Sequence, residues 1–473
     1  MEVWTSKIIR FLFNNGAALF SGVLLGLASP QVDLYGLVWI AIIPLWISIR
    51  AAENSRQAAF RAFLAGYVFH FMELSWMPVL TPWGGSWIYL GWALLALYLA
   101  LYFGIWGYVS HKFSFKNPVV HALAGALLFA LLEWVRTLGT FGVPVGQLNT
   151  MVIPILVIAR LAVWVGGAGL TFLVVLTNLL IAHVILDRRV VVLVVLVLAI
   201  GISSFFFPQT NPNSAQTLRI ALIQPNIPQE IKMEGDAADL IFAKLLELSQ
   251  KAVRESGSTD IVVWPETAVL EYITHHSRYM HPLREFVRKN KVSLIFGTPE
   301  FRGNGKDTNI FNSAVYMNPN GEIIGQYDKT QLVPFGEFLP LRPILYPFFR
   351  NFSFFQRDYT RGGRPVRFKH GETEIIPAIC FESMLSGNIR RRVPLGSALL
   401  LVITNDAWFE KTGIVTEHFR QGQLRAIENR IPLVQVGNTG FSGYVTPTGS
   451  VHTVTELMKQ STQIVDVAVS RSR

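Results

Sequence analysis

The first 207 residues of this 473-residue chain are apolar almost throughout, and no other feature constrains its fold as strongly. A helix that crosses a bilayer needs about 20 consecutive apolar residues. Seven stretches approach this length, near residues 11–28, 34–49, 58–79, 87–110, 119–136, 161–184 and 190–207. The sequence therefore predicts a polytopic α-helical membrane domain over residues 1–207, with about seven transmembrane helices. No Ala-x-Ala sequence follows the first stretch, so it is predicted to be a span and not a cleaved signal peptide.

The basic residues between these stretches indicate how the chain is oriented. With a cytoplasmic N-terminus, the cytoplasmic segments contain Lys7, Arg10, Arg50, Arg56, Arg61, Lys112, Lys116, Arg188 and Arg189. The loops on the other side contain only Arg136 and Arg160. Cytoplasmic loops carry the excess of Lys and Arg in membrane proteins. We therefore expect a cytoplasmic N-terminus and, after seven spans, a second half that lies outside the cytoplasm.

The composition supports a membrane protein and excludes other classes. The chain is 51% hydrophobic and 15% charged, whereas soluble globular proteins carry about 25% charged residues. The net charge of +10 suits either nucleic acid or an anionic membrane surface. The apolar first half favours the membrane, so no nucleic-acid partner is expected. Cys380 is the only cysteine, which excludes an intramolecular disulfide.

The sequence changes character at residues 208–216, where two prolines with Asn and Ser predict a linker. Residues 217–468 then have the pattern of an α/β domain. Short strand-like runs occur at 218–224, 260–264, 292–297, 311–317, 374–380, 398–404 and 432–437. Helical patterns occur between some of them, at 236–255 and 416–429. Strands that alternate with helices predict a layered sheet covered by helices.

Three strand-like segments end on residues that can do chemistry. Glu266 follows the run 260–264, Lys329 ends the segment 323–329, and Cys380 ends the run 374–380. Side chains at strand ends build sites on a rigid frame. A cysteine thiolate is a nucleophile, a neighbouring carboxylate can take its proton, and a lysine can stabilise an oxyanion. These residue types predict nucleophilic catalysis if the three side chains meet, which their spacing does not decide.

Four motifs resemble the nitrilase, or carbon–nitrogen hydrolase, superfamily. They are Trp264-Pro-Glu-Thr, Tyr327-Asp-Lys-Thr-Gln-Leu-Val-Pro-Phe-Gly-Glu337, Ile379-Cys-Phe-Glu382 and Asn405-Asp-Ala-Trp408. The stretch Val-Pro-Phe-Gly-Glu-Phe-Leu-Pro and the membrane half resemble one branch of it, the apolipoprotein N-acyltransferases, over nearly the whole chain. The resemblance implies a nitrilase-like αββα sandwich. In this sandwich Glu266 would be the general base, Lys329 the oxyanion stabiliser and Cys380 the nucleophile.

The resemblance also implies roles for residues around this triad. Glu337 is expected to orient Lys329 or to position the amine, and Glu382 to orient a neighbour; the alternative for each is a structural ion pair. Phe381 stands where the family often has Tyr. Trp408 resembles an aromatic residue near the acyl entrance, with a core tryptophan as the alternative. The family usually has an eighth span after the catalytic domain, for which this sequence has no apolar stretch.

Residues 338–355 are rich in Leu, Tyr, Pro and Phe and are too apolar for an ordinary exposed loop. We expect a lid that dips into the membrane interface and guides an acyl chain toward Cys380. The substrate-binding residues expected in it are Leu345, Tyr346, Phe348 and Phe349. The alternative is a segment that packs on the core of the domain.

The resemblance implies a two-step, ping-pong acyl transfer. An acyl chain first moves from a membrane phospholipid, expected to be like phosphatidylethanolamine, onto Cys380 as a thioester. The α-amino group of the N-terminal diacylglyceryl-cysteine of an apolipoprotein then takes it. We expect no cofactor, because no glycine-rich loop follows a strand in the nucleotide-binding manner. We also expect no metal, because the adjacent His275 and His276 would not share a helix face.

Three other interpretations stay open from the sequence. The first is a membrane-anchored carbon–nitrogen hydrolase, an amidase or nitrilase of a small amide, although seven spans exceed what an anchor needs. The second uses a Cys–His pair, with His370 or His418 as the base. The third is a membrane transporter or ligand-binding module. Few charges, chiefly Glu73 and Glu133, fall inside the predicted spans, which gives a transport pathway little support.

Overall fold

The computed structural model describes residues 2–187, 215–234, 237–273, 278–303, 308–350, 357–364, 366–393 and 398–470. The chain forms two compact units. The helical unit comprises residues 1–208 with 412–417, and the sheet unit comprises residues 209–411 with 418–473. Most of the predicted linker falls outside the described residues, so the predicted domain boundaries at 207 and 217 stay predictions.

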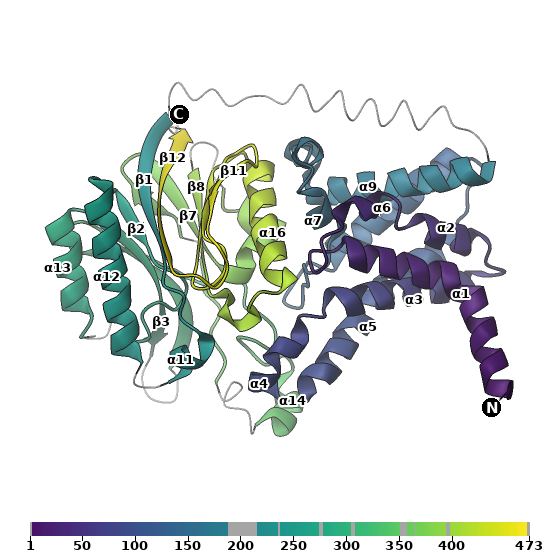
Figure 1. Ribbon diagram of the computed structural model, residues 1–473, viewed down its shortest axis with the longest axis horizontal. Helices are drawn as coiled ribbons and strands as arrows, with labels where there is room; N and C mark the ends of the chain where they lie inside the picture. The colour runs from purple at the N-terminus through teal and green to yellow at the C-terminus, as the bar shows by residue number, and fades with distance from the viewer. Residues whose placement is uncertain are drawn as a thin grey trace. The chain divides into compact units, whose positions relative to one another are not determined.

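The helices of the helical unit follow the apolar stretches of the sequence (Figure 1). The longer ones are α1 (Glu2–Ala28), α2 (Ile43–Arg50), α3 (Ser55–Glu73), α5 (Trp87–Lys112), α6 (Pro118–Val135) and α9 (Ala162–Asp187). Short turns of helix are η1 (Tyr35–Trp39), η2 (Met77–Leu80), α4 (Thr81–Gly84), α7 (Leu148–Val152) and α8 (Leu156–Ala159). The side chains of Asn54 and Asn117 cap α3 and α6 by accepting from backbone N–H groups of the first turn, which satisfies donors that a helix start leaves unpaired.

Three described helices are long and apolar enough to cross a membrane: α5, α6 and residues 162–185 of α9. Helix α3 makes a fourth if it forms one span with Met77–Gly84, from which it is bent by 51°. Asn15–Ala28 and Tyr35–Arg50 form shorter apolar helices. Six of the predicted spans therefore coincide with apolar helices. The predicted span at 190–207 lies outside the described residues, so the count of seven stays a prediction.

One face of α5 is suited to contact lipid. Its exposed apolar side chains recur every three or four residues, at Leu90, Leu94, Leu97, Leu101 and Ile105. This spacing places them in one stripe along the helix. A contiguous apolar stripe of this length is unfavourable in water and favourable in a bilayer. The packing of α5 thus agrees with its composition in indicating a membrane span.

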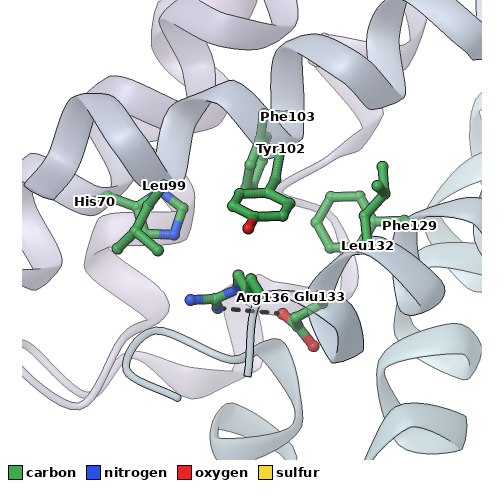
Figure 2. A pocket seen from close by; sticks show the side chains of 8 residues that line it. All are labelled: His70, Leu99, Tyr102, Phe103, Phe129, Leu132, Glu133 and Arg136. Carbon is green, nitrogen blue, oxygen red and sulfur yellow. Dashed lines mark ion pairs between the residues drawn. The ribbon is translucent and has the colours of Figure 1, made fainter. Parts of the chain in front are cut away.

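A small cavity lies inside the helical unit, and Figure 2 shows its lining side chains, which are His70, Leu99, Tyr102, Phe103, Phe129, Leu132, Glu133 and Arg136. Its volume is about 10 Å³, room for about one water molecule. Glu133 forms an ion pair with Arg136 at 3.8 Å and accepts a hydrogen bond from Leu148 N at 2.9 Å. Arg136 donates to the carbonyl of Val145 at 2.7 Å. The charged groups therefore hold helix ends and a loop together, and the cavity is too small for a substrate.

The sheet unit contains two six-stranded sheets. The first has the order β12-β1-β2-β3-β4-β5, with β1 (Ala215–Gln224), β2 (Ile261–Val263), β3 (Ser293–Arg302), β4 (Asn309–Met317), β5 (Ile323–Asp328) and β12 (Ser461–Ser470). The second has the order β11-β10-β9-β8-β7-β6, with β6 (Phe368–His370), β7 (Thr373–Ile379), β8 (Ala398–Thr404), β9 (Leu433–Gly437), β10 (Gly443–Val445) and β11 (Val451–Val454). In each sheet three neighbouring strands are parallel, β1-β2-β3 and β7-β8-β9.

Helices cover the outer face of each sheet (Figure 1). On the first sheet they are α12 (Ala238–Ser256) and α13 (Met280–Asn290), and on the second α16 (Gly413–Asn429), whose residues from His418 onward belong to the sheet unit. The other described helices of the unit are α11 (Gln229–Met233), α14 (Arg342–Phe349) and α15 (Ser386–Arg390), with the short turns η6 (Cys380–Met384) and η7 (Asp406–Phe409). Because strand side chains alternate between faces, Val262 packs toward α12 and α13, while Val263 packs between the sheets. Ile376 and Ile375 divide in the same way on the second sheet. The result is the predicted αββα sandwich.

Candidate active site

Glu266, Lys329 and Cys380 lie just beyond the ends of three strands, β2, β5 and β7. Strands β2 and β5 belong to the first sheet and β7 belongs to the second. The Lys329 ammonium lies 3.6 Å from Glu266 Oε1, and the charges of both side chains act on the Cys380 thiol. The structure therefore brings together three residues that lie far apart in the sequence, so the site exists only in the folded domain.

The Glu266 carboxylate is buried and is held from both sheets. Asn312 on β4 donates through Nδ2 to Glu266 Oε1 at 2.7 Å. The backbone N–H of Asn405, just beyond β8, donates to Glu266 Oε2 at 2.8 Å. The loop that carries Glu266 passes close to β3, where a Cβ on Gly297 would lie 2.6 Å from the Glu266 Cα. Only glycine leaves room for this approach.

Lys329 is 1% exposed, and its ammonium faces two carboxylates. Nζ donates to Glu337 Oε1 at 2.9 Å. Burial disfavours the charged form, but the carboxylates of Glu337 and Glu266 outweigh burial and raise the pKa of Lys329 well above its usual value. The group is therefore a fixed positive charge beside Cys380, where an oxyanion would develop during attack on a carbonyl.

Cys380 begins η6 with a φ of +51°, which is strained for a residue other than glycine. Such strain is common where a side chain is held for function. Burial, together with the negative charge of Glu266, raises the pKa of the Cys380 thiol well above its usual value, and Lys329 opposes this. The thiol is therefore protonated at neutral pH, so a nearby base would be needed to generate a thiolate.

Asn312 is a site residue that the sequence analysis did not single out. Its Nδ2 group donates to Glu266 Oε1 at 2.7 Å and to Glu337 Oε1 at 2.9 Å, which uses both of its hydrogens. Glu337 also accepts from Val333 N at 2.9 Å. Two acids, one lysine and one amide thus form a single buried network. The only signal in the sequence is a polar residue in a strand whose residues from Phe311 onward are buried and mostly apolar.

Glu382 lies two residues beyond Cys380 and is fully buried. Its Oε1 accepts from the Tyr327 hydroxyl at 2.7 Å and from the backbone N–H groups of Thr330 and Gln331 at 2.9 and 3.2 Å. Its Oε2 accepts from the Ile379 N–H at 2.9 Å. One carboxylate therefore joins the turn after Lys329 to the turn that carries Cys380. This geometry favours an orienting role for Glu382.

The variant Glu382→Gln is expected to be destabilised by about 3 kcal/mol. An amide can accept on only one atom, so its NH₂ group would face N–H or O–H donors that the carboxylate now accepts from. The measurement is the unfolding free energy, or the thermal midpoint, of the purified full-length protein.

Glu374→Gln on the same β7 strand is the matched control, because the ion pair of Glu374 with Arg367 is largely exposed. The control is expected to lose less than about 1 kcal/mol. Equal losses in the two variants would contradict the assigned role of Glu382.

The other predicted site residues lie around or beyond this network. Phe381 is the second residue of η6 and Trp408 lies in η7, and both are partly exposed. The four residues expected in the lid all belong to α14; they are Leu345, Tyr346, Phe348 and Phe349. Arg342 of α14 stacks on the Tyr346 ring at 4.6 Å, and Ile344 is 64% exposed. The predicted lid segment continues into residues 351–356, which lie outside the described residues.

The two histidines weighed as alternative bases make other contacts. His370 Nδ1 lies 2.7 Å from the Tyr316 hydroxyl. His418 Nε2 lies 3.1 Å from the backbone carbonyl oxygen of Cys380. Within the described part of the chain, these contacts give no support to a Cys–His pair at the sulfur.

Both halves of the chain are similar to known proteins. A profile described as carbon-nitrogen hydrolase matches residues 219–473, and a profile described as apolipoprotein N-acyltransferase N-terminal domain matches residues 21–180. The apolipoprotein N-acyltransferase of Geobacter metallireducens is 31% identical over 461 residues, which cover 94% of this chain and 87% of that protein. The one from Photobacterium profundum is 29% identical over 438 residues, covering 88% and 82%. Among solved structures, Saccharomyces cerevisiae Nit3 has a TM-score of 0.41 at 15% identity, covering 55% of this chain and 93% of its own.

An αββα sandwich with Glu, Lys and Cys at its strand ends, matched over its whole length by the carbon-nitrogen hydrolase profile, is a nitrilase-type domain. Here that domain follows a helical unit with three membrane-spanning candidates, and the similarity extends through both units. The chain belongs to the apolipoprotein N-acyltransferase family. It is a bacterial inner-membrane protein.

Proposed function

We propose that this protein transfers an acyl chain from a membrane phospholipid, through a thioester on Cys380, to the α-amino group of the N-terminal diacylglyceryl-cysteine of apolipoproteins. The observation that carries the proposal is the buried network in which the charges of Glu266 and Lys329 act on the Cys380 thiol. It occurs in a chain whose similarity to apolipoprotein N-acyltransferases spans both units.

In the first step, the Glu266 carboxylate takes the thiol proton and the sulfur attacks the ester carbonyl of the phospholipid. The Lys329 ammonium stabilises the oxyanion. When the tetrahedral intermediate collapses, the C–O bond breaks and Glu266 returns the proton to the departing oxygen. Lysophospholipid leaves, and an acyl-thioester remains on Cys380.

In the second step, the free amine of the apolipoprotein attacks the thioester carbonyl. Glu266 takes a proton from the amine, and the C–S bond breaks to release the N-acylated product. Glu266 then returns the proton to the Cys380 sulfur, which regenerates the thiol and the carboxylate. Glu337 keeps Lys329 in place through its 2.9 Å hydrogen bond. Glu382 holds the two turns that present Lys329 and Cys380.

The acyl chains of both substrates lie in the bilayer, so an enzyme anchored there by its helical unit meets both substrates in the plane of the membrane. We propose that α14 forms a lid, with Leu345, Tyr346, Phe348 and Phe349 along the acyl path and Phe381 and Trp408 near its inner end. The exposed apolar side chains of Leu341 and Ile344 support this placement. A cytoplasmic N-terminus and a periplasmic sheet unit belong to the same proposal, supported by the excess of basic residues on one side of the spans.

The test is intact-mass spectrometry of the purified full-length protein after incubation with phosphatidylethanolamine vesicles and no acceptor. The expected result is a mass increase of one fatty acyl group, which disappears when a diacylglyceryl-cysteine peptide is added. Cys380→Ala is the control and is expected to show no adduct, because it has no nucleophile. An adduct that persists in Cys380→Ala, or a folded wild-type protein that forms none and instead releases ammonia from small amides, would overturn the proposal.

A further inference from the structure

A buried histidine lies behind the cysteine and contacts its backbone, not its sulfur. His418 on α16 is 4% exposed, and its Nε2 lies 3.1 Å from the Cys380 carbonyl oxygen and 2.9 Å from the Ser383 hydroxyl. The Ser383 hydroxyl donates to the same carbonyl at 3.0 Å. On the other side of the ring, Nδ1 lies 3.0 Å from Asp406 Oδ1. All four residues belong to the sheet unit.

These contacts determine the protonation of the ring. A backbone carbonyl oxygen and a carboxylate oxygen can only accept hydrogen bonds, so both ring nitrogens must donate. The Ser383 hydroxyl donates its hydrogen to the carbonyl and can therefore accept from Nε2. A neutral imidazole has only one N–H and would leave one of these contacts unmade. An imidazolium, in a buried ion pair with Asp406, is the state in which all of these contacts are made.

The charges around the ring favour the same state. Burial lowers the pKa of His418, but Asp406 on η7, the Cys380 carbonyl and the more distant Glu266 outweigh burial and raise it above the usual value. Asp406 is itself 1% exposed and receives a further hydrogen bond from the Thr404 hydroxyl at 3.0 Å. Gly440 makes room for this carboxylate, because a Cβ there would lie 2.3 Å from Asp406 Oδ2.

The carbonyl that the imidazolium contacts belongs to the strained residue of the site. A left-handed φ is unfavourable in a residue other than glycine, and Cys380 has a φ of +51°. A charge-assisted hydrogen bond to its carbonyl is stronger than a neutral one and can hold the peptide in this conformation. The direction in which the sulfur points follows from that conformation.

We propose that His418 is a positioning residue: an imidazolium, paired with Asp406, that clamps the Cys380 carbonyl and so holds the nucleophile in its strained conformation. The inference rests on the proposed function, because it takes Cys380 to be the residue that is acylated. It gives His418 a role different from the general base of a Cys–His pair. The proton on Nε2 stays in place throughout the reaction.

The first test is a ¹H–¹⁵N correlation spectrum of the full-length protein with ¹⁵N-labelled histidine, assigned with His418→Gln. Both ring nitrogens of His418 are expected to stay protonated from about pH 6 to about pH 8. The exposed ring of His452 supplies a reference signal from a solvent-accessible histidine in the same sample. An unprotonated Nε2 in this range would overturn the inference, whatever the acylation assay shows.

The second test measures the rate of Cys380 acylation by phosphatidylethanolamine against pH in Asp406→Asn. The amide oxygen of the new side chain would still accept from Nδ1 but would no longer raise the His418 pKa. His418 would therefore lose its Nε2 proton, and with it the clamp, at a lower pH than in the wild type. The rate is expected to fall about tenfold between about pH 6 and about pH 8. Loss of the Asp406 charge also lowers the Cys380 pKa, and additional thiolate at high pH can raise the rate but cannot lower it. An acylation rate that falls as the pH rises would therefore indicate that His418 has lost its proton.

Controls separate this inference from the proposed function. His418→Gln is expected to slow acylation by about 10- to 100-fold, the range for small misplacements of a reacting group. His370→Asn, which changes a histidine that contacts Tyr316, is expected to stay within about twofold. A wild-type protein that forms no adduct would refute the proposed function, whereas an Asp406→Asn profile that matches the wild type would refute the clamp alone.

Discussion

Replacing Lys329 by methionine is expected to slow acylation of Cys380 by about 10²- to 10³-fold, the usual effect of removing one oxyanion donor. Methionine keeps the length and apolar stem of the side chain, so the loss reports on the ammonium. The variant also leaves Glu266 and Glu337, which share the Asn312 amide, as neighbouring acids without the ammonium between them.

The same variant is expected to lose about 3–5 kcal/mol of unfolding free energy, as for other buried pairs that lose one partner. The folded pKa of Lys329 is raised, so the stabilisation from its charge is complete below the unfolded pKa. This stabilisation is lost only as the pH rises through the folded pKa. The contribution of Lys329 to the unfolding free energy of the wild type is therefore expected to be constant across the neutral range.

Lys232→Met is the matched control. Lys232 is a second buried lysine near the site. Its Nζ donates to the backbone carbonyl oxygen of Glu266 at 3.3 Å, not to the Glu266 carboxylate. Burial lowers the pKa of Lys232 to about 8, although Glu266 opposes this. We expect this variant to keep acylation within about tenfold of the wild type. Single-turnover acylation and a thermal unfolding curve measure both effects, and equal rates for the two variants would contradict the role of Lys329.

The sheet unit was largely predictable from sequence because its buried strands are short apolar runs with turn residues at both ends. Seven runs and the segment ending on Lys329 coincide with β1–β5 and β7–β9. The four strands that were not predicted lie at or next to sheet edges, where β10 has three residues and β11 is mostly exposed. The short strands β6, β10 and β11 depend on their neighbours for pairing and carry no apolar run of their own. In β12 the buried Val465, Val467 and Val469 alternate with other residues.

The site was predictable only in part, for a physical reason. Glu266, Lys329 and Cys380 follow strands, and strand ends deliver side chains to a common edge. Asn312 lies within a strand, and His418 lies on a helix, where a polar residue in an amphipathic pattern looks like any solvated position. Their hydrogen bonds to Glu266 and to the Cys380 carbonyl depend on pairings between distant segments. Only the packed structure shows that these polar groups are buried and directed at the site.

Glu266→Gln is expected to lower the acylation rate at neutral pH by about 10²- to 10⁴-fold, the usual contribution of a general base. Glutamine keeps the size of the side chain and can still accept from the Asn405 N–H, but it cannot take the thiol proton. Its NH₂ group would also face the Asn312 amide and the Lys329 ammonium, both donors. Some of the loss will therefore come from disturbed packing, and the rate alone does not identify a base.

The pH dependence of the acylation rate identifies the base. In the wild type, Glu266 removes the proton as the sulfur attacks, so the rate does not require free thiolate. In Glu266→Gln, the rate must follow the thiolate fraction, which rises about tenfold per pH unit below the thiol pKa. Losing the Glu266 charge lowers that pKa, but burial, the largest cause of its elevation, remains. The variant is therefore expected to recover steadily as the pH is raised through the neutral range.

Glu337→Gln is the matched comparison, because Glu337 contacts the same Asn312 amide and the same Lys329 ammonium as Glu266 does. If Glu337 acts only through Lys329, its variant will be slower than the wild type at every pH but will keep the wild-type profile. A steep rise with pH in Glu337→Gln, with a flat profile in Glu266→Gln, would mean that Glu337 is the base and that Glu266 acts through Lys329. Parallel profiles in both variants would mean that neither carboxylate removes the thiol proton in the rate-limiting step.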